Sequence, residues 1–139
     1  MEGQAVEVVL IEDDPNDAEL ILRVLRKNHL ANSIVHLKDG AEALQYLFAH
    51  GALNPKMILL DLKLPKVNGI EVLQRLKSEE ATRDVPVVVL TSSRENGDLQ
   101  HAYDLGVNSY VAKPIHFDEF AAAVAELGLY WMMLNRPPK

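Results

Sequence analysis

The sequence contains no cysteine. It therefore has no disulfide framework, no thiolate nucleophile and no zinc–thiolate site. Basic residues are scarce as well, because 14 lysine and arginine residues stand against 20 aspartate and glutamate residues, for a net charge of −6. Nucleic-acid phosphates are bound by basic surfaces, so this balance argues against a chain whose direct partner is nucleic acid.

Long hydrophobic runs are also missing. Every apolar run is shorter than the roughly 20 residues that a membrane-spanning helix needs, and residues 1–6 lack the features of a signal peptide. We therefore expect a soluble cytoplasmic protein with no membrane contact. Apolar residues still make up 48% of the 139 residues, which is enough to bury a core. We expect one domain over residues 1–139, with an extended C-terminal helix.

Two patterns alternate along the chain. Five short runs rich in Val, Ile and Leu have the length of strands. They lie at 6–11, 33–37, 57–60, 85–90 and 109–112. Each run is followed by a segment whose apolar residues recur at offsets of three, four and seven, as on one face of a helix. This alternation predicts a doubly wound α/β fold, with a five-stranded parallel sheet and helices on both faces.

Polar side chains follow four of the five runs. Glu12 and Asp13 follow the first run, Asp61 the third, Thr91 the fourth and Lys113 the fifth. Ligands of open α/β sheets bind beyond the carboxyl ends of the strands, where these residues are expected to meet. Asp14 precedes Pro15 and is expected only to cap a helix.

The chemistry of this set indicates a phosphoryl site. Clustered carboxylates repel one another unless their pKa values rise or a hard cation binds among them. Oxygen ligands favour Mg²⁺, Mn²⁺ or Ca²⁺. A carboxylate can attack phosphorus, while a cation and an ammonium group neutralise the phosphoryl oxygens and a hydroxyl donates a hydrogen bond.

The sequence resembles the receiver domains of response regulators in two-component signalling, of the chemotaxis-regulator type. The resemblance covers essentially the whole chain and rests on four motifs in order. They are 9–15 (VLIEDDP), 61–69 (DLKLPKVNG), 90–92 (LTS) and 110–114 (YVAKP). It implies a flavodoxin-like sheet with strand order 2-1-3-4-5. It also implies a regulatory phosphoprotein. Such a protein is not a conventional enzyme, although it promotes its own phosphorylation and dephosphorylation.

The resemblance assigns roles to the clustered residues. Asp61 would be the phosphoacceptor. Mg²⁺ or Mn²⁺ would be bound directly by Asp13 and Asp61, through water by Glu12, and by the backbone carbonyl of Lys63. The side chain of Lys63 stands beside the acceptor and could influence the lifetime of the phosphoryl group in either direction.

The remaining roles concern signalling. Thr91 would hydrogen-bond the phosphoryl group and Lys113 would form an ion pair with it. The Lys113–Pro114 peptide bond would be cis. Movement of Thr91 toward the phosphoryl group would let Tyr110 turn inward, and the altered surface would signal to a downstream protein.

The C-terminal segment suggests partners. Phe120, Val124, Leu127 and Trp131 recur at helical spacing and form either a homodimer seam or the contacts of an overlong helix with its own domain. The tail 129–138 resembles that of single-domain regulators paired with phytochrome-type sensor kinases, which implies a sensor histidine kinase as phosphoryl donor. No DNA-binding region follows, so we expect output through protein contact or phosphate relay.

Three other readings are open to the same residues. A receiver that only docks, without phosphorylation, would not need Asp61, Thr91 and Lys113 intact. A metal-dependent phosphatase of the haloacid-dehalogenase type needs a second aspartate where Lys63 stands. A flavodoxin-like cofactor binder needs a phosphate loop where this chain has the acidic residues 12–14.

Overall fold

The sheet has the predicted parallel arrangement. The computed structural model describes residues 8–27, 33–49, 55, 57–64, 67–92, 96–107, 109–113, 116 and 118–122. Its five strands all pair in parallel in the order β2-β1-β3-β4-β5. They are β1 (Val8–Ile11), β2 (Ile34–Leu37), β3 (Met57–Asp61), β4 (Val87–Ser92) and β5 (Ser109–Lys113). The flavodoxin-like order expected from the resemblance is therefore confirmed.

The limits of the fourth strand differ from the prediction of 85–90. Val85 donates its N–H to the carbonyl of Thr82 at 3.0 Å, which closes a turn, and Pro86 has no N–H to donate to a neighbouring strand. The strand therefore starts at Val87 and continues to Ser92. Thr91 consequently lies within β4, opposite Ala112 of β5, and not beyond the strand end.

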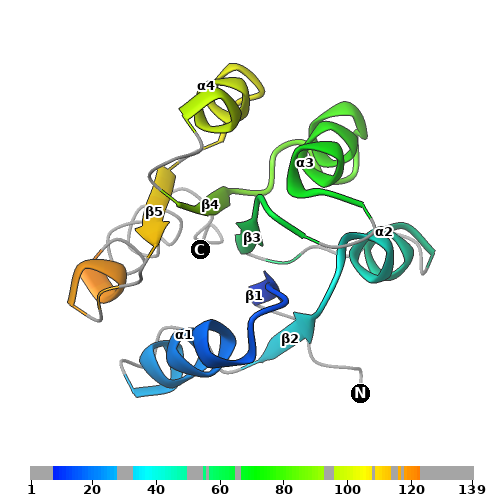
Figure 1. Cartoon of the computed structure of the whole chain (residues 1–139). Coiled ribbons are helices and arrows are strands. Elements are labelled where there is room, and N and C mark those ends of the chain that lie inside the picture. Colours follow the sequence, from blue (N-terminus) through cyan, green and yellow to red (C-terminus); the bar gives the residue numbers. More distant parts are fainter. Residues whose placement is uncertain are drawn as a thin grey trace, which may run out of the picture.

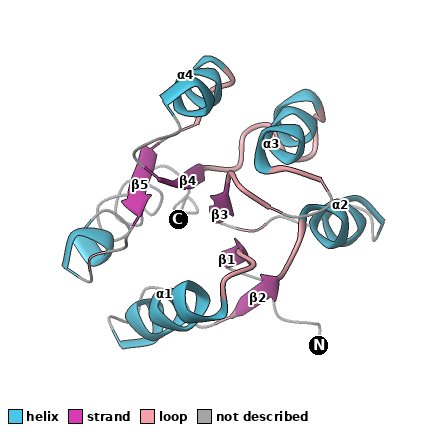
Figure 2. Cartoon of the chain, in the orientation of Figure 1, coloured by secondary structure: helices cyan, strands magenta, loops and turns pink. Residues whose placement is uncertain are grey.

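Helices cover both faces of the sheet. They are α1 (Pro15–Lys27), α2 (Gly40–Ala49), α3 (Gly69–Ser78) and α4 (Asn96–Asp104), and a further helical turn spans 118–122. Figure 1 shows α2, α3 and α4 on one side of the sheet and α1 with the 118–122 turn on the other, and Figure 2 separates helices, strands and loops in the same view. No helix in the described part of the chain is long and apolar enough to cross a membrane.

Alternating strand residues explain the two layers. In β1, Val9 and Ile11 join the buried cluster beneath α2 and α3, whereas Val8 and Leu10 join the cluster beneath α1. β3 and β4 alternate in the same way. Because successive side chains of a strand point to opposite faces, a nearly unbroken apolar run fills both cores.

Side-chain caps set where the helices begin. Asp14 accepts hydrogen bonds through Oδ1 from the N–H groups of Asn16 and Asp17, at 2.8 and 3.2 Å, as predicted for a cap. Asn68 and Glu71 form a reciprocal capping box at α3. These caps fix the starts of α1 and α3, the two helices that follow the acidic ends of β1 and β3.

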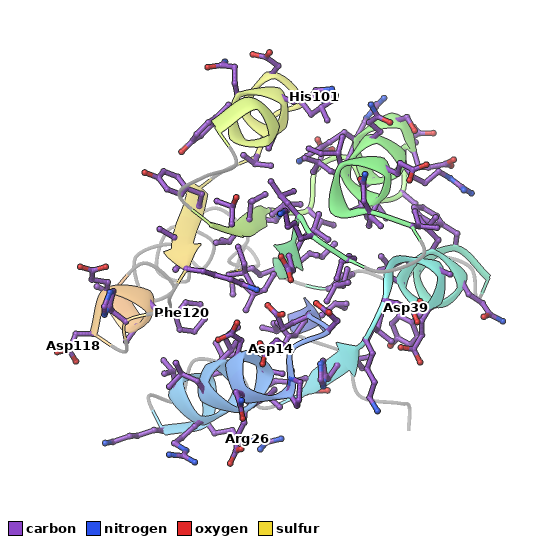
Figure 3. All side chains as sticks on the ribbon, viewed as in Figure 1. Asp14, Arg26, Asp39, His101, Asp118 and Phe120 are labelled. Carbon is purple, nitrogen blue, oxygen red and sulfur yellow. The ribbon has the colours of Figure 1, made fainter. Side chains whose placement is uncertain are left out.

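The predicted last helix is described only over 118–122. Phe120 is fully buried in the cluster beneath α1 and points toward the sheet, whereas Asp118 points away from it (Figure 3). The side chain of Phe120 thus belongs to the core of its own domain and offers no surface to a second chain. Val124, Leu127 and Trp131, the other residues of the predicted dimer seam, lie outside the described residues.

Candidate functional site

Three strand ends bring opposite charges together. The ammonium group of Lys113, the last residue of β5, donates hydrogen bonds to Glu12 Oε2 at 3.1 Å and to Asp61 Oδ2 at 3.0 Å. Glu12 directly follows β1 and Asp61 ends β3, so one cation links three strands. The two carboxylates are 0% and 3% exposed. The predicted convergence of these residues at the carboxyl edge of the sheet is what the structure shows.

The backbone of Glu12 is held by the edge strand β2. Its N–H donates to the carbonyl of Leu37 at 3.0 Å, and its carbonyl accepts from Nε2 of His36 at 2.8 Å. Since a carbonyl only accepts, Nε2 of His36 carries the proton. Glu12 Oε2 also accepts from the N–H of Asp14 at 3.0 Å. These bonds orient the acidic loop before α1 begins.

Asp61 is oriented by the loop that follows it. Its Oδ1 accepts from the backbone N–H of Lys63 at 3.0 Å. The start of α3 packs directly behind this loop, where Gly69 donates its N–H to the carbonyl of Leu62 at 2.9 Å. A Cβ atom on Gly69 would lie only 2.4 Å from the carbonyl oxygen of Asp61, so this close approach requires glycine.

Burial dominates the electrostatics of the site. Burial, with repulsion from Asp61 added, raises the pKa of Glu12 to about 8. Burial likewise raises the pKa of Asp61, although Lys113 and the N–H of Lys63 oppose the shift. Burial alone would lower the pKa of Lys113, but Asp61 and Glu12 together raise it above its usual value. The site thus contains more carboxyl groups than ammonium groups, and Lys113 stays protonated.

The acidic residues fit a hard divalent cation. Glu12, Asp13 and Asp61 each offer a carboxylate oxygen, and these oxygens lie within 4.8 Å of one another. Glu12 Oε1 is buried and accepts no hydrogen bond from any described residue, although it lies 3.0 Å from Nζ of Lys113. A group of carboxylate oxygens that includes a buried oxygen without a hydrogen bond suits Mg²⁺ or Mn²⁺ rather than a softer metal.

The two predicted switch residues lie in different surroundings. Thr91 is buried at 3% exposure, opposite Ala112 and one residue after Leu90, which pairs with Asp61. Tyr110 of β5 is 44% exposed and packs edge to face on Tyr103 of α4, with ring centroids 6.1 Å apart. Tyr110 therefore points outward in this structure. Pro114 lies outside the described residues, so the predicted cis peptide bond is not described.

Two site contacts were not predicted from the sequence. Asp17 of α1 places Oδ2 at 3.3 Å from Nζ of Lys113, and His36 holds the carbonyl of Glu12. Asp17 lies in the first turn of α1, and no spacing in the sequence pairs it with Lys113.

The protein is similar to known signalling proteins over nearly its whole length. Response regulator Rcp1 of Synechocystis is 33% identical over 90% of this chain and 88% of its own length. A solved structure described as the Mn²⁺-bound form of Rcp1 covers 96% of this chain and 99% of that chain, with a TM-score of 0.75.

Two relatives are more similar in sequence. The probable methanogenesis regulatory protein FilR2 of Methanothrix harundinacea is 44% identical over 94% of this chain and 86% of its own length. A solved structure of the bacteriophytochrome response regulator RtBRR is 49% identical, with a TM-score of 0.79, and covers 97% of this chain and 85% of that chain. The family model of the response regulator receiver domain matches residues 8–125. The chain therefore belongs to the response regulator receiver family.

Proposed function

We propose that this receiver accepts a phosphoryl group on Asp61 from a phosphohistidine of a sensor histidine kinase. The observation that carries the proposal is the position of Asp61. Its Oδ2 accepts from Lys113 and its Oδ1 from the N–H of Lys63, at 3.0 Å each. A carboxylate held between two donors is fixed in orientation, and both donors oppose the rise in its pKa that burial causes.

The proposed step is a displacement at phosphorus. A carboxylate oxygen of Asp61 forms a bond to phosphorus, and the bond from phosphorus to the imidazole nitrogen of the donor breaks. That nitrogen keeps the electron pair, and the product on Asp61 is an acyl phosphate. Lys113 compensates the charge on the phosphoryl oxygens, and Thr91 in the neighbouring strand supplies a hydroxyl donor.

A divalent cation, Mg²⁺ or Mn²⁺, belongs to this proposal. Asp13, Asp61 and Glu12 (the last through water) would hold it, with the carbonyl of Lys63. Such a cation would neutralise phosphoryl oxygens during transfer. The Mn²⁺-bound form of the relative Rcp1 supports this reading. The chain's own carboxylates and Lys113 orient the acceptor and balance its charge.

Signalling would follow from Thr91 and Tyr110. The outward position of Tyr110, at 44% exposure, fits the phosphoryl-free state. Movement of the Thr91 hydroxyl toward a phosphoryl group would vacate space for Tyr110 to turn inward. The surface formed by α4 and β5 would then change shape and bind a downstream protein differently.

The proposed donor is a phytochrome-type histidine kinase, since a bacteriophytochrome response regulator is 49% identical to this chain. Because such a kinase draws on cytoplasmic ATP, the proposal places the chain in the cytoplasm. A homodimer through the last helix, at Val124, Leu127 and Trp131, is part of the same proposal, as is a single receiver domain over 1–139. Its output would be protein contact, with no direct binding of nucleic acid.

Intact-protein mass spectrometry tests phosphorylation. The wild-type chain, Asp61→Asn and Asp104→Asn are incubated with acetyl phosphate, with and without Mg²⁺. Asp104 is an exposed aspartate on α4 and serves as the matched control. We expect a Mg²⁺-dependent gain of one phosphoryl group in the wild type and the control only. Equal uptake by Asp61→Asn would place the acceptor elsewhere, and no uptake from either acetyl phosphate or a phosphorylated kinase would favour a docking module.

A further inference from the structure

Lys113 has a third carboxylate partner that comes from α1. Asp17 Oδ2 lies 3.3 Å from Nζ of Lys113, with the two side chains 26% and 20% exposed. The contact joins the first turn of α1 to the end of β5. None of the roles described above uses Asp17.

The lysine has few donors left for a further anion. An ammonium group carries three N–H donors. One bonds Glu12 Oε2 and another Asp61 Oδ2, while Asp17 occupies a third side. A phosphoryl group on Asp61 would bring new anionic oxygens that Lys113 has to serve. The Asp61 oxygen itself becomes part of the acyl phosphate, so for Lys113 to bond more than one phosphoryl oxygen, either Glu12 or Asp17 must release it.

Burial decides which partner releases the lysine. Glu12 is 0% exposed, so the loss of Lys113 would remove a donor that bulk water cannot readily replace. Asp17 is 26% exposed, and water can replace the ammonium group at little cost. Asp17 is therefore the partner that yields.

We propose that Asp17 is a positioning residue that holds Lys113 in the phosphoryl-free state and competes with the phosphoryl group for it. This inference rests on the function proposed above and concerns the regulation of the same site. Asp17 would lower the affinity of the site for an anion bound at Asp61. Its removal would make Lys113 available in advance and favour the activated form.

Binding of beryllofluoride, a phosphoryl mimic, tests this role. Its affinity is measured at saturating Mg²⁺ for the wild type, Asp17→Asn, Asp17→Ala and Glu19→Gln. Glu19 lies on the same helix, 71% exposed and paired with Arg23, so Glu19→Gln removes an equal charge away from Lys113. We expect about two- to fivefold tighter binding for both Asp17 variants, in line with the loss of one partly exposed ion pair, and no change for Glu19→Gln.

A second readout separates positioning from structure. The ¹⁵N resonance of the Lys113 ammonium group should move in Asp17→Asn without beryllofluoride and stay in place in Glu19→Gln. If the wild type binds beryllofluoride but both Asp17 variants bind it no more tightly, the inference is overturned and the proposed function stands. Equal tightening by Glu19→Gln also overturns it. If the wild type binds none, the proposed function fails and the inference fails with it.

Discussion

At the scale of single residues, the site is a balance of buried charges. Lys113 contacts three carboxylates, those of Glu12, Asp61 and Asp17. Burial raises the pKa of Glu12 to about 8, so metal-free protein near neutral pH keeps a proton that an unfolded chain would release. The same burial makes each of these side chains sensitive to the loss of its partners.

This balance predicts how stability depends on pH. The ordinary pKa of 4.5 applies to Glu12 in the unfolded chain, whereas the folded value is about 8. Between these values the folded state binds more protons, so the free energy of unfolding falls as pH rises from about 5 to 8. Thermal denaturation of the metal-free chain should show this fall, and Glu12→Gln should reduce it. Asp61, whose pKa is also raised, would account for the remaining slope.

A bound divalent cation should oppose this loss of stability at higher pH. Because carboxylates bind a cation only when deprotonated, added Mg²⁺ should raise the denaturation temperature more at pH 8 than at pH 6. A pH-independent stability in the metal-free wild type, or an equal effect of Mg²⁺ at both pH values, would contradict this account of Glu12.

The switch residues make a separate prediction. Thr91→Ala removes the hydroxyl group but leaves Asp61 and Lys113, so beryllofluoride should still bind. The environment of Tyr110 should then no longer respond to it. Fluorotyrosine NMR measures the response of the Tyr110 ring to beryllofluoride. Tyr110 and Tyr103 are the exposed large apolar residues among those described, so a change in their surroundings should shift their resonances. A full response of Tyr110 in Thr91→Ala would show that the two residues are not linked.

At the scale of helices and strands, packing behind the site keeps it in shape. The start of α3 lies against the carbonyl of Asp61, where a Cβ on Gly69 would come within 2.4 Å. Gly106, which follows α4 with φ of 98°, has open space around its Cα instead. Both positions require glycine, but only a side chain at position 69 would push against the loop that carries Asp61.

Substitution at these two glycines should separate stability from binding. Gly69→Ala should destabilise the fold by roughly 1–3 kcal/mol through overpacking and should weaken Mn²⁺ binding. Gly106→Ala should cost about 1–2 kcal/mol through its positive φ and leave Mn²⁺ binding unchanged. Denaturant unfolding and metal titration measure the two effects. Equal Mn²⁺ affinity in Gly69→Ala and wild type would show that the packing of α3 does not affect metal binding at the site.

The sheet and its acidic edge could be predicted because parallel strands end at one edge. Apolar runs mark the strands, so residues at their ends must gather even when far apart in sequence. The start of β4 was predicted two residues early, since Val85 is apolar but closes a turn. The contact of Asp17 with Lys113 could not be predicted, because it depends on how α1 lies against the sheet. For the same reason the sequence left open whether Phe120 packs on its own domain or on a second chain, and the structure shows the former.

At the scale of the whole molecule, the site lies at the edge of a sheet that two helical layers cover (Figure 1). The proposed signal from Asp61 would reach the surface through β4 and β5, which pair from Val88 to Ser92. The residues that would join two copies of the chain follow Phe120, whose own side chain is buried.

The dimer is tested by one substitution in the tail. Trp131→Ala should weaken self-association by about tenfold or more, as loss of a large aromatic anchor does, and leave phosphoryl uptake unchanged. Trp131→Phe keeps an aromatic ring and serves as the control. Sedimentation equilibrium measures the association. A wild type that stays monomeric at high concentration, with and without beryllofluoride, would exclude the proposed seam.

The central claim is that Asp61 carries the phosphoryl group. Borohydride reduces an aspartyl phosphate to homoserine, which peptide mass spectrometry locates along the chain. After incubation with acetyl phosphate and Mg²⁺, we predict homoserine at position 61 and at no other aspartate. Homoserine at position 13 or elsewhere, with Asp61 unmodified, would contradict the account.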